Sequence, residues 1–87
     1  MFYVYVLKSQ KTGSLYMGFT RDLRKRVKEH NQKRTRTTQS HTPLILIYYE
    51  ACLNEKDAKR REHYLKTTQG GRLLKRRLKE YFYKLNH

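Results

Sequence analysis

The chain has 87 residues, of which 37% are hydrophobic and 13% aromatic, and this composition excludes a disordered segment. We expect one small domain spanning residues 1–87. Twenty-one Lys and Arg residues against seven Asp and Glu residues give a formal net charge of +14. Such a field attracts polyanions, so nucleic acid is the expected partner, ahead of an anionic membrane surface. The alternative is that the charges only solvate the surface.

The sequence also limits compartment and metal chemistry. No apolar run approaches the length of a membrane span, and the start "MFYVYVLKSQ" lacks the pattern of a signal peptide, so we expect a cytoplasmic protein without membrane association. The single cysteine, Cys52, excludes an internal disulfide and is expected to be a small buried hydrophobe. One cysteine and no histidine pair at ligand spacing argue against a structural zinc site. The oligomeric state is not encoded in these patterns, and a monomer is the default expectation.

The N-terminal third predicts a β-hairpin followed by a helix. "FYVYVL" (2–7) is apolar at both parities, which is typical of a strand covered on both faces, and "LYMGFT" (15–20) follows a turn as the second strand. The first helix is predicted over 21–31, with Thr20 as its N-cap and with Leu23 and Val27 as its buried stripe. Asp22, Arg26 and His30 recur every four residues, so they form one row along the edge of that stripe.

The remainder predicts one more strand and two helices. Residues 32–42 contain no large apolar residue and are expected to form an exposed basic loop. "PLILIYYEA" (43–51) is apolar on both faces and is predicted to be a central strand. Asn54 is the predicted N-cap of a helix over 55–68, "QGG" is expected to break it, and a last helix is predicted over 72–85. The predicted fold class is therefore α+β, a small antiparallel or mixed three-stranded sheet flanked by helices in the order β-β-α-β-α-α.

Glu62 is the most informative single residue of the second predicted helix. Ala58 lies four residues before it and Leu65 three after, so Glu62 shares the inward stripe with two apolar residues. A buried, unpaired carboxylate costs several kcal/mol, on the order of the whole stability of a small domain, so it requires a cation, donors or a metal. The alternative is an edge position and a surface pair with Lys59 or Lys66, each one turn away.

The tyrosines raise a similar choice. The chain has eight, and Tyr3, Tyr5 and Tyr16 belong to the predicted hairpin. A buried tyrosine is usually a core residue whose hydroxyl finds one partner, and a functional role would require the hydroxyl to meet charged groups. Gly18, two residues after Tyr16, either bends the strand end or lets another group approach closely.

These motifs together resemble a known family. "YVYVL", then "LYMGFTRDLRKRVKEHN", and later an A-x-x-x-E-x-x-L-K helix are similar to the GIY-YIG nuclease domain, and especially to its small stand-alone, poorly characterised branch. The resemblance covers nearly the whole chain. It implies a β-β-α-β-α core and a hydrolytic reaction on nucleic-acid phosphodiesters.

The resemblance also implies site residues. Tyr5 matches the tyrosine of the first motif and Tyr16 that of the second, Arg26 the active-site arginine, and His30 a proton-handling or phosphate-contacting group. Glu62 would be the ligand of one divalent metal, normally Mg²⁺, with Mn²⁺ as an alternative. In this chemistry Arg26 holds a phosphate oxygen and Tyr5 positions or deprotonates the attacking water. Base action by a phenol, whose ordinary pKa is about 10, requires Arg26 or the metal to lower it.

We therefore expect a metal-dependent endonuclease, or alternatively a non-catalytic basic nucleic-acid-binding module that keeps the nuclease fold. DNA is expected before RNA, although neither the kind of nucleic acid, nor sequence or structure specificity, nor the pathway follows from these residues. The basic residues expected to contact nucleic acid come from the two concentrations of positive charge, residues 21–36 and 56–79, and are Arg24, Lys25, Lys33, Arg34, Arg36, Lys66 and Arg72.

Overall fold

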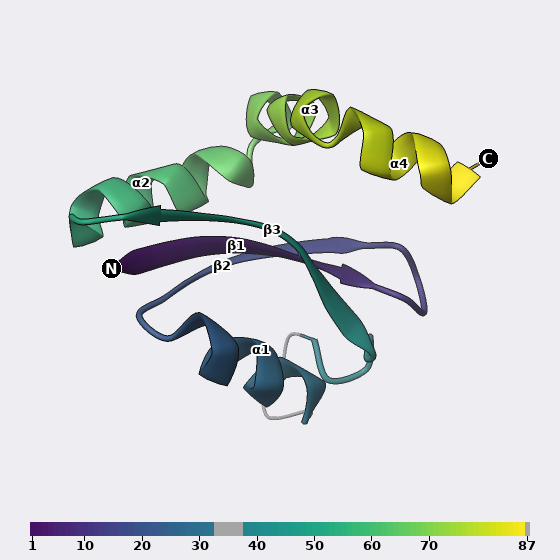
Figure 1. Cartoon of the computed structure of the whole chain (residues 1–87), viewed down its shortest axis with the longest axis horizontal. Coiled ribbons are helices and arrows are strands. Elements are labelled where there is room, and N and C mark those ends of the chain that lie inside the picture. Colours follow the sequence, from purple (N-terminus) through teal and green to yellow (C-terminus); the bar gives the residue numbers. More distant parts are fainter. Residues whose placement is uncertain (33–37, 87) are drawn as a thin grey trace.

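The computed structural model describes residues 1–32 and 38–86, and it contains a three-stranded sheet with helices on both faces (Figure 1). The strands are β1 (Phe2–Ser9), β2 (Leu15–Thr20) and β3 (Leu44–Cys52), in the spatial order β2-β1-β3 with both pairs antiparallel. The predicted α+β class and the order of strands and helices are confirmed.

The central strand is β1, as its composition suggests, because Val4, Tyr5, Val6 and Leu7 are all buried. The prediction that residues 43–51 form a central strand is wrong, since β3 pairs only with β1 and forms an edge of the sheet. Its apolar residues on both faces are explained by helices that cover the two sides of the sheet, not by a second neighbouring strand.

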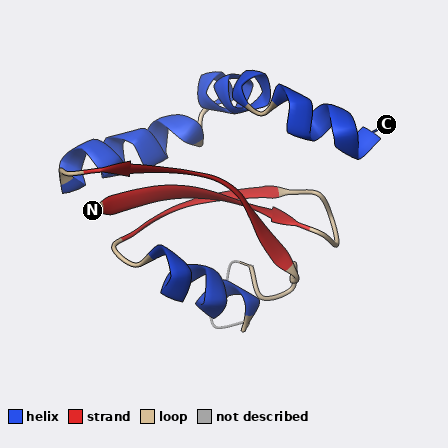
Figure 2. Cartoon of the chain, in the orientation of Figure 1, coloured by secondary structure: helices blue, strands red, loops and turns tan. Residues whose placement is uncertain are grey.

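The helices divide into two layers (Figure 2). Helix α1 (Leu23–Asn31) covers one face, and its Leu23 and Val27 pack with Leu7 and Leu44 of the sheet. Helices α2 (Glu55–Leu65) and α3 (Thr68–Arg77) cover the other face. Helix α4 (Lys79–Asn86) continues from α3 toward the C-terminus. Within the described part of the chain, no helix combines the length and the apolar character needed to cross a bilayer.

Side chains at the ends of α1 position this helix on the sheet. The predicted N-cap Thr20 is wrong, because the Asp22 side chain accepts the N–H of Lys25 at 3.1 Å and caps the helix. The Thr20 hydroxyl instead accepts the N–H of Asp22 in the preceding turn. At the other end, the Asn31 amide donates to the carbonyl of Leu44 and accepts its N–H, at 2.8 and 2.7 Å. The end of α1 is therefore tied to the start of β3.

The C-terminal helices differ from the prediction in two places. Asn54 caps α2 as predicted, but α2 ends at Leu65, and the "QGG" stretch lies inside the first turn of α3, whose N-cap is Thr67. The predicted helix over 72–85 is split at Leu78, where the backbone leaves helical geometry with φ −106° and ψ 28°. Close contact between α2 and α3, which local sequence preference does not report, explains the position of Gly70.

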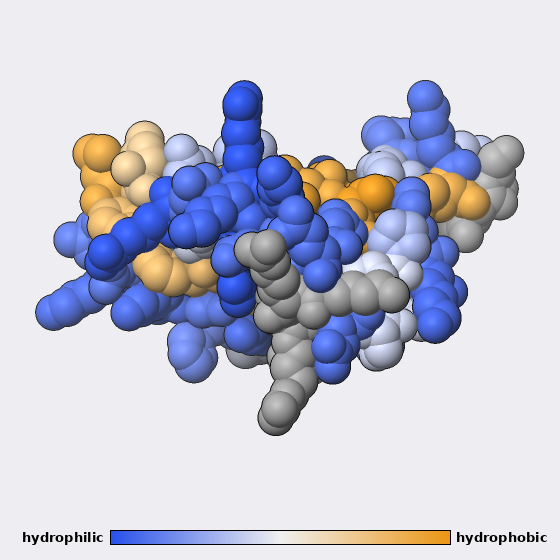
Figure 3. Space-filling model, turned by 90° about the horizontal axis from the view of Figure 1, so that it is seen from below, coloured by the Kyte–Doolittle hydropathy of each residue, from blue (hydrophilic) through white to orange (hydrophobic). Residues whose placement is uncertain are grey.

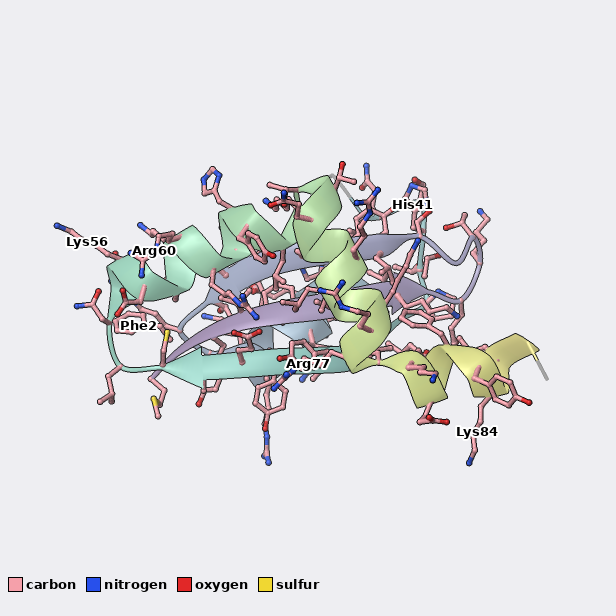
Figure 4. The ribbon with its side chains drawn as sticks, turned by 90° about the horizontal axis from the view of Figure 1, so that it is seen from above. Phe2, His41, Lys56, Arg60, Arg77 and Lys84 are labelled. Carbon is pink, nitrogen blue, oxygen red and sulfur yellow. The ribbon has the colours of Figure 1, made fainter. Side chains whose placement is uncertain are left out.

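A polar network anchors the second layer to the β3 edge. Arg61 donates to both carboxylate oxygens of Glu50 at 2.9 Å, and Tyr48 donates to the same carboxylate at 2.9 Å. Arg77 donates to the Tyr48 hydroxyl at 2.9 Å, and Figure 4 shows Arg77 lying over β3 where α3 crosses the sheet. Although burial alone would raise the pKa of Glu50, the hydrogen bonds from Arg61 and Tyr48 hold that pKa below its ordinary value. Two members of the basic stretch 56–79 are therefore structural.

Two adjacent glycines of α3 provide a matched test of this packing. A Cβ on Gly70 would overlap the carbonyl oxygen of Tyr64 and lie 2.6 Å from the Cα of Leu65, whereas a Cβ on Gly71 would meet nothing within 4 Å. We expect Gly70→Ala to destabilise the protein by about 1–3 kcal/mol, because backbone atoms must move. Gly71→Ala is expected to be neutral or to stabilise it by up to about 1 kcal/mol through helix propensity. Urea unfolding measures both; equal effects would contradict the proposed α2–α3 contact.

Candidate active site

The candidate site begins with a close approach between neighbouring strands. Tyr5 of β1 is opposite Gly18 of β2 in the antiparallel register, so both face the α1 side of the sheet. A Cβ at position 18 would overlap the hydroxyl and the ring of Tyr5. Gly18 therefore allows the Tyr5 ring to lie across β2, and the close-approach alternative for this glycine is the one observed.

The Tyr5 hydroxyl meets two side chains of α1. It lies 3.0 Å from Nε2 of His30, and Nε of Arg26 donates to it at 3.4 Å. On its other side, Nδ1 of His30 lies 2.7 Å from the Thr38 hydroxyl. Because Arg26 can only donate, the phenol proton is available for Nε2, and the network is satisfied when Nδ1 carries the imidazole proton and donates to Thr38.

Burial decides the protonation of this cluster. It raises the pKa of Tyr5, and this effect outweighs the hydrogen bond and the charge of Arg26, which lower it. Base action by an ionised Tyr5 would require Arg26 or a metal to lower its pKa below the ordinary value, and Arg26 alone does not do so. Burial, followed by the charge of Arg26, lowers the pKa of His30 below 6.5 and outweighs the opposite effect of Glu29. Near neutral pH, Tyr5 is a neutral phenol beside a neutral imidazole.

Next to this cluster is a hollow beyond the free edge of β2, between α1 and α2. Its volume is about 440 Å³, and its lining includes Arg26 and Glu29 of α1 and Lys59 of α2. Arg26 and Glu29 form an ion pair of 3.7 Å, and the Arg26 side chain keeps 38% of its surface exposed. A phosphate entering this hollow would therefore meet the guanidinium that already contacts Tyr5.

Glu62 lies on α2, in the second helical layer, and is not among the residues that line this hollow. Its side chain is 20% exposed, and its Oε2 lies 3.2 Å from Nζ of Lys66, which is the surface pair left open by the sequence. Its charge also acts on Tyr5, where it contributes a smaller upward effect on the pKa than burial does. Among the described residues, no group of three or more His, Cys, Asp or Glu side chains could hold a metal ion. A metal bound to Glu62 would therefore have at most one further ligand of these types among the described residues.

The other predicted tyrosine and two further residues form the neighbouring part of this face. Tyr16 packs against the ring of His41, with centroids 5.4 Å apart, and against the hydrophobic cluster that contains Tyr5. Thr38 is buried, with 1% of its surface exposed, although it belongs to the stretch predicted as an exposed loop. Sequence reasoning missed Thr38 and His41 because their contacts, with His30 of α1 and Tyr16 of β2, lie outside the loop and leave no periodic signal.

The basic residues predicted to contact nucleic acid are only partly gathered here. Arg24, Lys25, Lys66 and Arg72 are exposed, and Lys25 lines the hollow beside Arg26. Lys33, Arg34 and Arg36 lie outside the described residues. The view from the α1 side is dominated by hydrophilic residues (Figure 3).

Comparison with known proteins shows which family the chain is similar to. The family model of the GIY-YIG catalytic domain matches residues 1–72. The UPF0213 protein CPE1444 of Clostridium perfringens is 43% identical over 67 residues, covering 76% of this chain and 71% of the relative. The UPF0213 protein YazA of Bacillus subtilis is 40% identical over 65 residues, covering 74% of this chain and 65% of the relative.

A solved structure agrees with the fold. The solution NMR structure of the UPF0213 protein BH0048 from Bacillus halodurans has a TM-score of 0.53 and 29% sequence identity, and the match covers 85% of this chain and 82% of that chain. The matched region holds Tyr5, Gly18, Arg26, His30 and Glu62. The chain therefore belongs to the GIY-YIG family, whose catalytic domain is of the nuclease type, and its relatives are the small stand-alone UPF0213 proteins.

Proposed function

We propose that this protein is a metal-dependent endonuclease that hydrolyses nucleic-acid phosphodiesters, with DNA as its first expected substrate. The observation that carries this proposal is the contact of the Tyr5 hydroxyl with both Arg26 and His30 beside an open hollow that Arg26 lines. A buried phenol joined to a guanidinium and an imidazole has more polar partners than a core tyrosine needs.

Arg26 is the proposed phosphate-binding group. One N–H of its guanidinium is directed at Tyr5, and the side chain is partly exposed to the hollow. A guanidinium offers five donors in a planar fork, so it can hold a non-bridging phosphate oxygen while it orients the phenol. Removing one such electrostatic donor typically costs about 10²- to 10³-fold in rate.

Tyr5 and His30 form the proposed proton path. Because Tyr5 is a neutral phenol, it does not need to be ionised before the reaction starts. Its oxygen accepts a proton from the attacking water as its own proton passes to Nε2 of His30, which lies 3.0 Å away. The water thereby becomes a hydroxide equivalent and His30 becomes an imidazolium. The lowered pKa of His30 keeps Nε2 free to accept that proton at neutral pH. Tyr16, packed on His41, is assigned a supporting position on the same face.

Glu62 is the residue that would hold a divalent metal. Its Oε2 is paired with Lys66, and its Oε1 has no partner within the part of the chain that the structure describes. A single hard oxygen ligand suits Mg²⁺ or Mn²⁺, which commonly keep several waters and bind through one or two carboxylates together with substrate phosphates. When bound, the metal would neutralise charge that develops on the phosphate oxygens.

One observation favours the second candidate function, a nucleic-acid-binding module without catalysis. The Glu62–Lys66 pair gives the carboxylate a structural explanation, and among the described residues Glu62 belongs to no group of three or more possible metal ligands. The same fold and the same basic face would then bind nucleic acid without cutting it.

A neutral substitution of Glu62 separates the two candidates. Wild-type protein is incubated with single-stranded, duplex and branched DNA and RNA, with and without Mg²⁺ or Mn²⁺. We expect metal-dependent cleavage of at least one DNA substrate, and we expect Glu62→Gln to slow it by about a hundredfold or more while nucleic-acid binding is kept.

The control is Glu80→Gln on α4, which makes the same change of charge at an exposed site outside the proposed machinery. This variant should cut at the wild-type rate. A wild type that binds the panel but cuts no member with either metal would support the binding module, and cleavage unaffected by Glu62→Gln would remove this residue from the site.

The buried neutral state of His30 predicts how stability depends on pH. Its pKa is lowered on folding, so the unfolded chain binds more protons between the unfolded value of about 6.5 and the folded value. The contribution of His30 to stability is complete above that window and is lost as the pH falls through it. In urea unfolding from pH 7.5 to 5, we expect His30→Gln to lose less stability than wild type on acidification, whatever its stability at pH 7.5. The exposed His63→Gln is the control and should follow wild type; equal slopes for all three would contradict a buried neutral His30.

A further inference from the structure

A second groove lies on the α1 side of the sheet, at the edge opposite to the candidate active site. It runs between α1 and β3 and has a volume of about 460 Å³, within the range of ordinary ligand sites. Its floor is apolar and its rim is basic, and it is lined by Leu23, Arg24, Val27, Lys28, Leu46 and Tyr49. The candidate active site uses the free edge of β2, so the two sites flank α1.

Tyr49 is the main feature of this groove. Half of it is exposed, at 51%, although it belongs to a strand, and Leu46 beside it is 37% exposed. The ring of Tyr49 meets that of Tyr3 edge to face, with centroids 6.1 Å apart and planes inclined by 60°. This contact holds the ring in place without covering the groove, so a flat partner would lose little conformational entropy of the protein on stacking.

The rim of the groove has positive charge that the protein does not neutralise. Arg24 and Lys28 are exposed and lie one turn apart on α1. Neither has an ion-pair partner within residues 1–32 and 38–86, whereas Arg26 on the same helix is paired with Glu29. A second copy of a chain with a net charge of +14 would be repelled from this rim, so an anionic partner is favoured.

We propose that the groove binds unpaired nucleotides of a nucleic-acid strand, with a base stacked on Tyr49 and phosphates on Arg24 and Lys28. An aromatic ring beside basic side chains is how proteins without sequence preference bind single strands, because every base has a face that can stack. In a duplex the faces of the bases are covered by their neighbours, so Tyr49 selects single strands or frayed ends.

The groove lies close enough to the candidate active site to affect which substrate is cut. This role in substrate choice rests on the proposed nuclease function. A helix with its side chains is about 10–12 Å across, and nucleotides along one strand are spaced by about 3.4 Å when stacked, so three or four of them would cross α1. A strand held on Tyr49 could thus reach Arg26 on the other flank. The substrate class is then a nucleic acid with an unpaired segment a few nucleotides from the bond to be cut.

Binding measured without metal tests the groove separately from cleavage. The probes are a fluorescein-labelled oligothymidylate, the same strand with abasic sites throughout, and a blunt duplex of equal length, each titrated in EDTA and followed by anisotropy. We expect Tyr49→Ala to weaken binding of the oligothymidylate by at least about fivefold, which corresponds to the lower end of base–aromatic stacking. Binding of the abasic strand and of the duplex should change by less than twofold, and Tyr49→Phe should retain wild-type affinity for the oligothymidylate.

Tyr83→Ala is the matched control, because Tyr83 lies on α4 and is exposed to a similar degree, 59% against 51% for Tyr49. It should bind all three probes as wild type does, and thermal unfolding verifies that both alanine variants are folded. Oligothymidylate binding by Tyr49→Ala equal to that of wild type would overturn the proposal, as would an equal loss on all three probes. Wild-type self-association that Tyr49→Ala abolishes would overturn it too, since the occupant would then be a second copy. If the wild type cuts nucleic acid and Tyr49→Ala binds the oligothymidylate as well as wild type does, the groove proposal alone is refuted. If Tyr49→Ala weakens oligothymidylate binding but the wild type cuts no substrate, the nuclease proposal alone is refuted.

Discussion

The close packing of Tyr5 across Gly18 is the contact on which the candidate site depends. It replaces a side chain of β2 by a ring from β1, and it brings a hydroxyl from the middle of the sheet to the level of α1. There the hydroxyl contacts both Arg26 and His30. Since any larger residue at position 18 would displace the ring, this glycine is needed for a close approach and not for an unusual backbone angle.

Helix α1 has three different surfaces within nine residues, and each has a separate task. Its apolar stripe, Leu23 and Val27, attaches it to the sheet. One flank presents Arg26 and His30 to Tyr5 and Arg26 also to the hollow, and the other flank presents Arg24 and Lys28 to the groove at β3. The strong positive charge of the chain is accordingly not one uniform property. On the other side of the sheet, Arg61 and Arg77 neutralise or orient polar groups of β3, whereas the free cations of α1 remain available to an anionic partner.

Residues close in sequence were the most predictable part of the site. Arg26 and His30 share one row of a single helix, so a helical wheel placed them together, and local patterns identified all three strands and the cap at Asn54. Features created by contacts between separate elements were not predictable. The edge position of β3 depends on which strand joins β1, and the burial of Thr38 depends on a partner eight residues earlier on α1. The partner of Glu62 was ambiguous for a related reason, because a helical wheel cannot decide between a metal and Lys66.

The most direct test asks whether Tyr5 and His30 act as one catalytic unit. Single-turnover cleavage of a nucleic-acid substrate in Mg²⁺ is compared for wild type, Tyr5→Phe, His30→Gln and the double variant. We expect each single variant to be slower by about a hundredfold or more, and the double variant to be little slower than the worse single one, because residues that pass one proton are not additive. Cleavage at the wild-type rate by Tyr5→Phe, or losses that multiply in the double variant, would contradict a shared proton path through this hydroxyl.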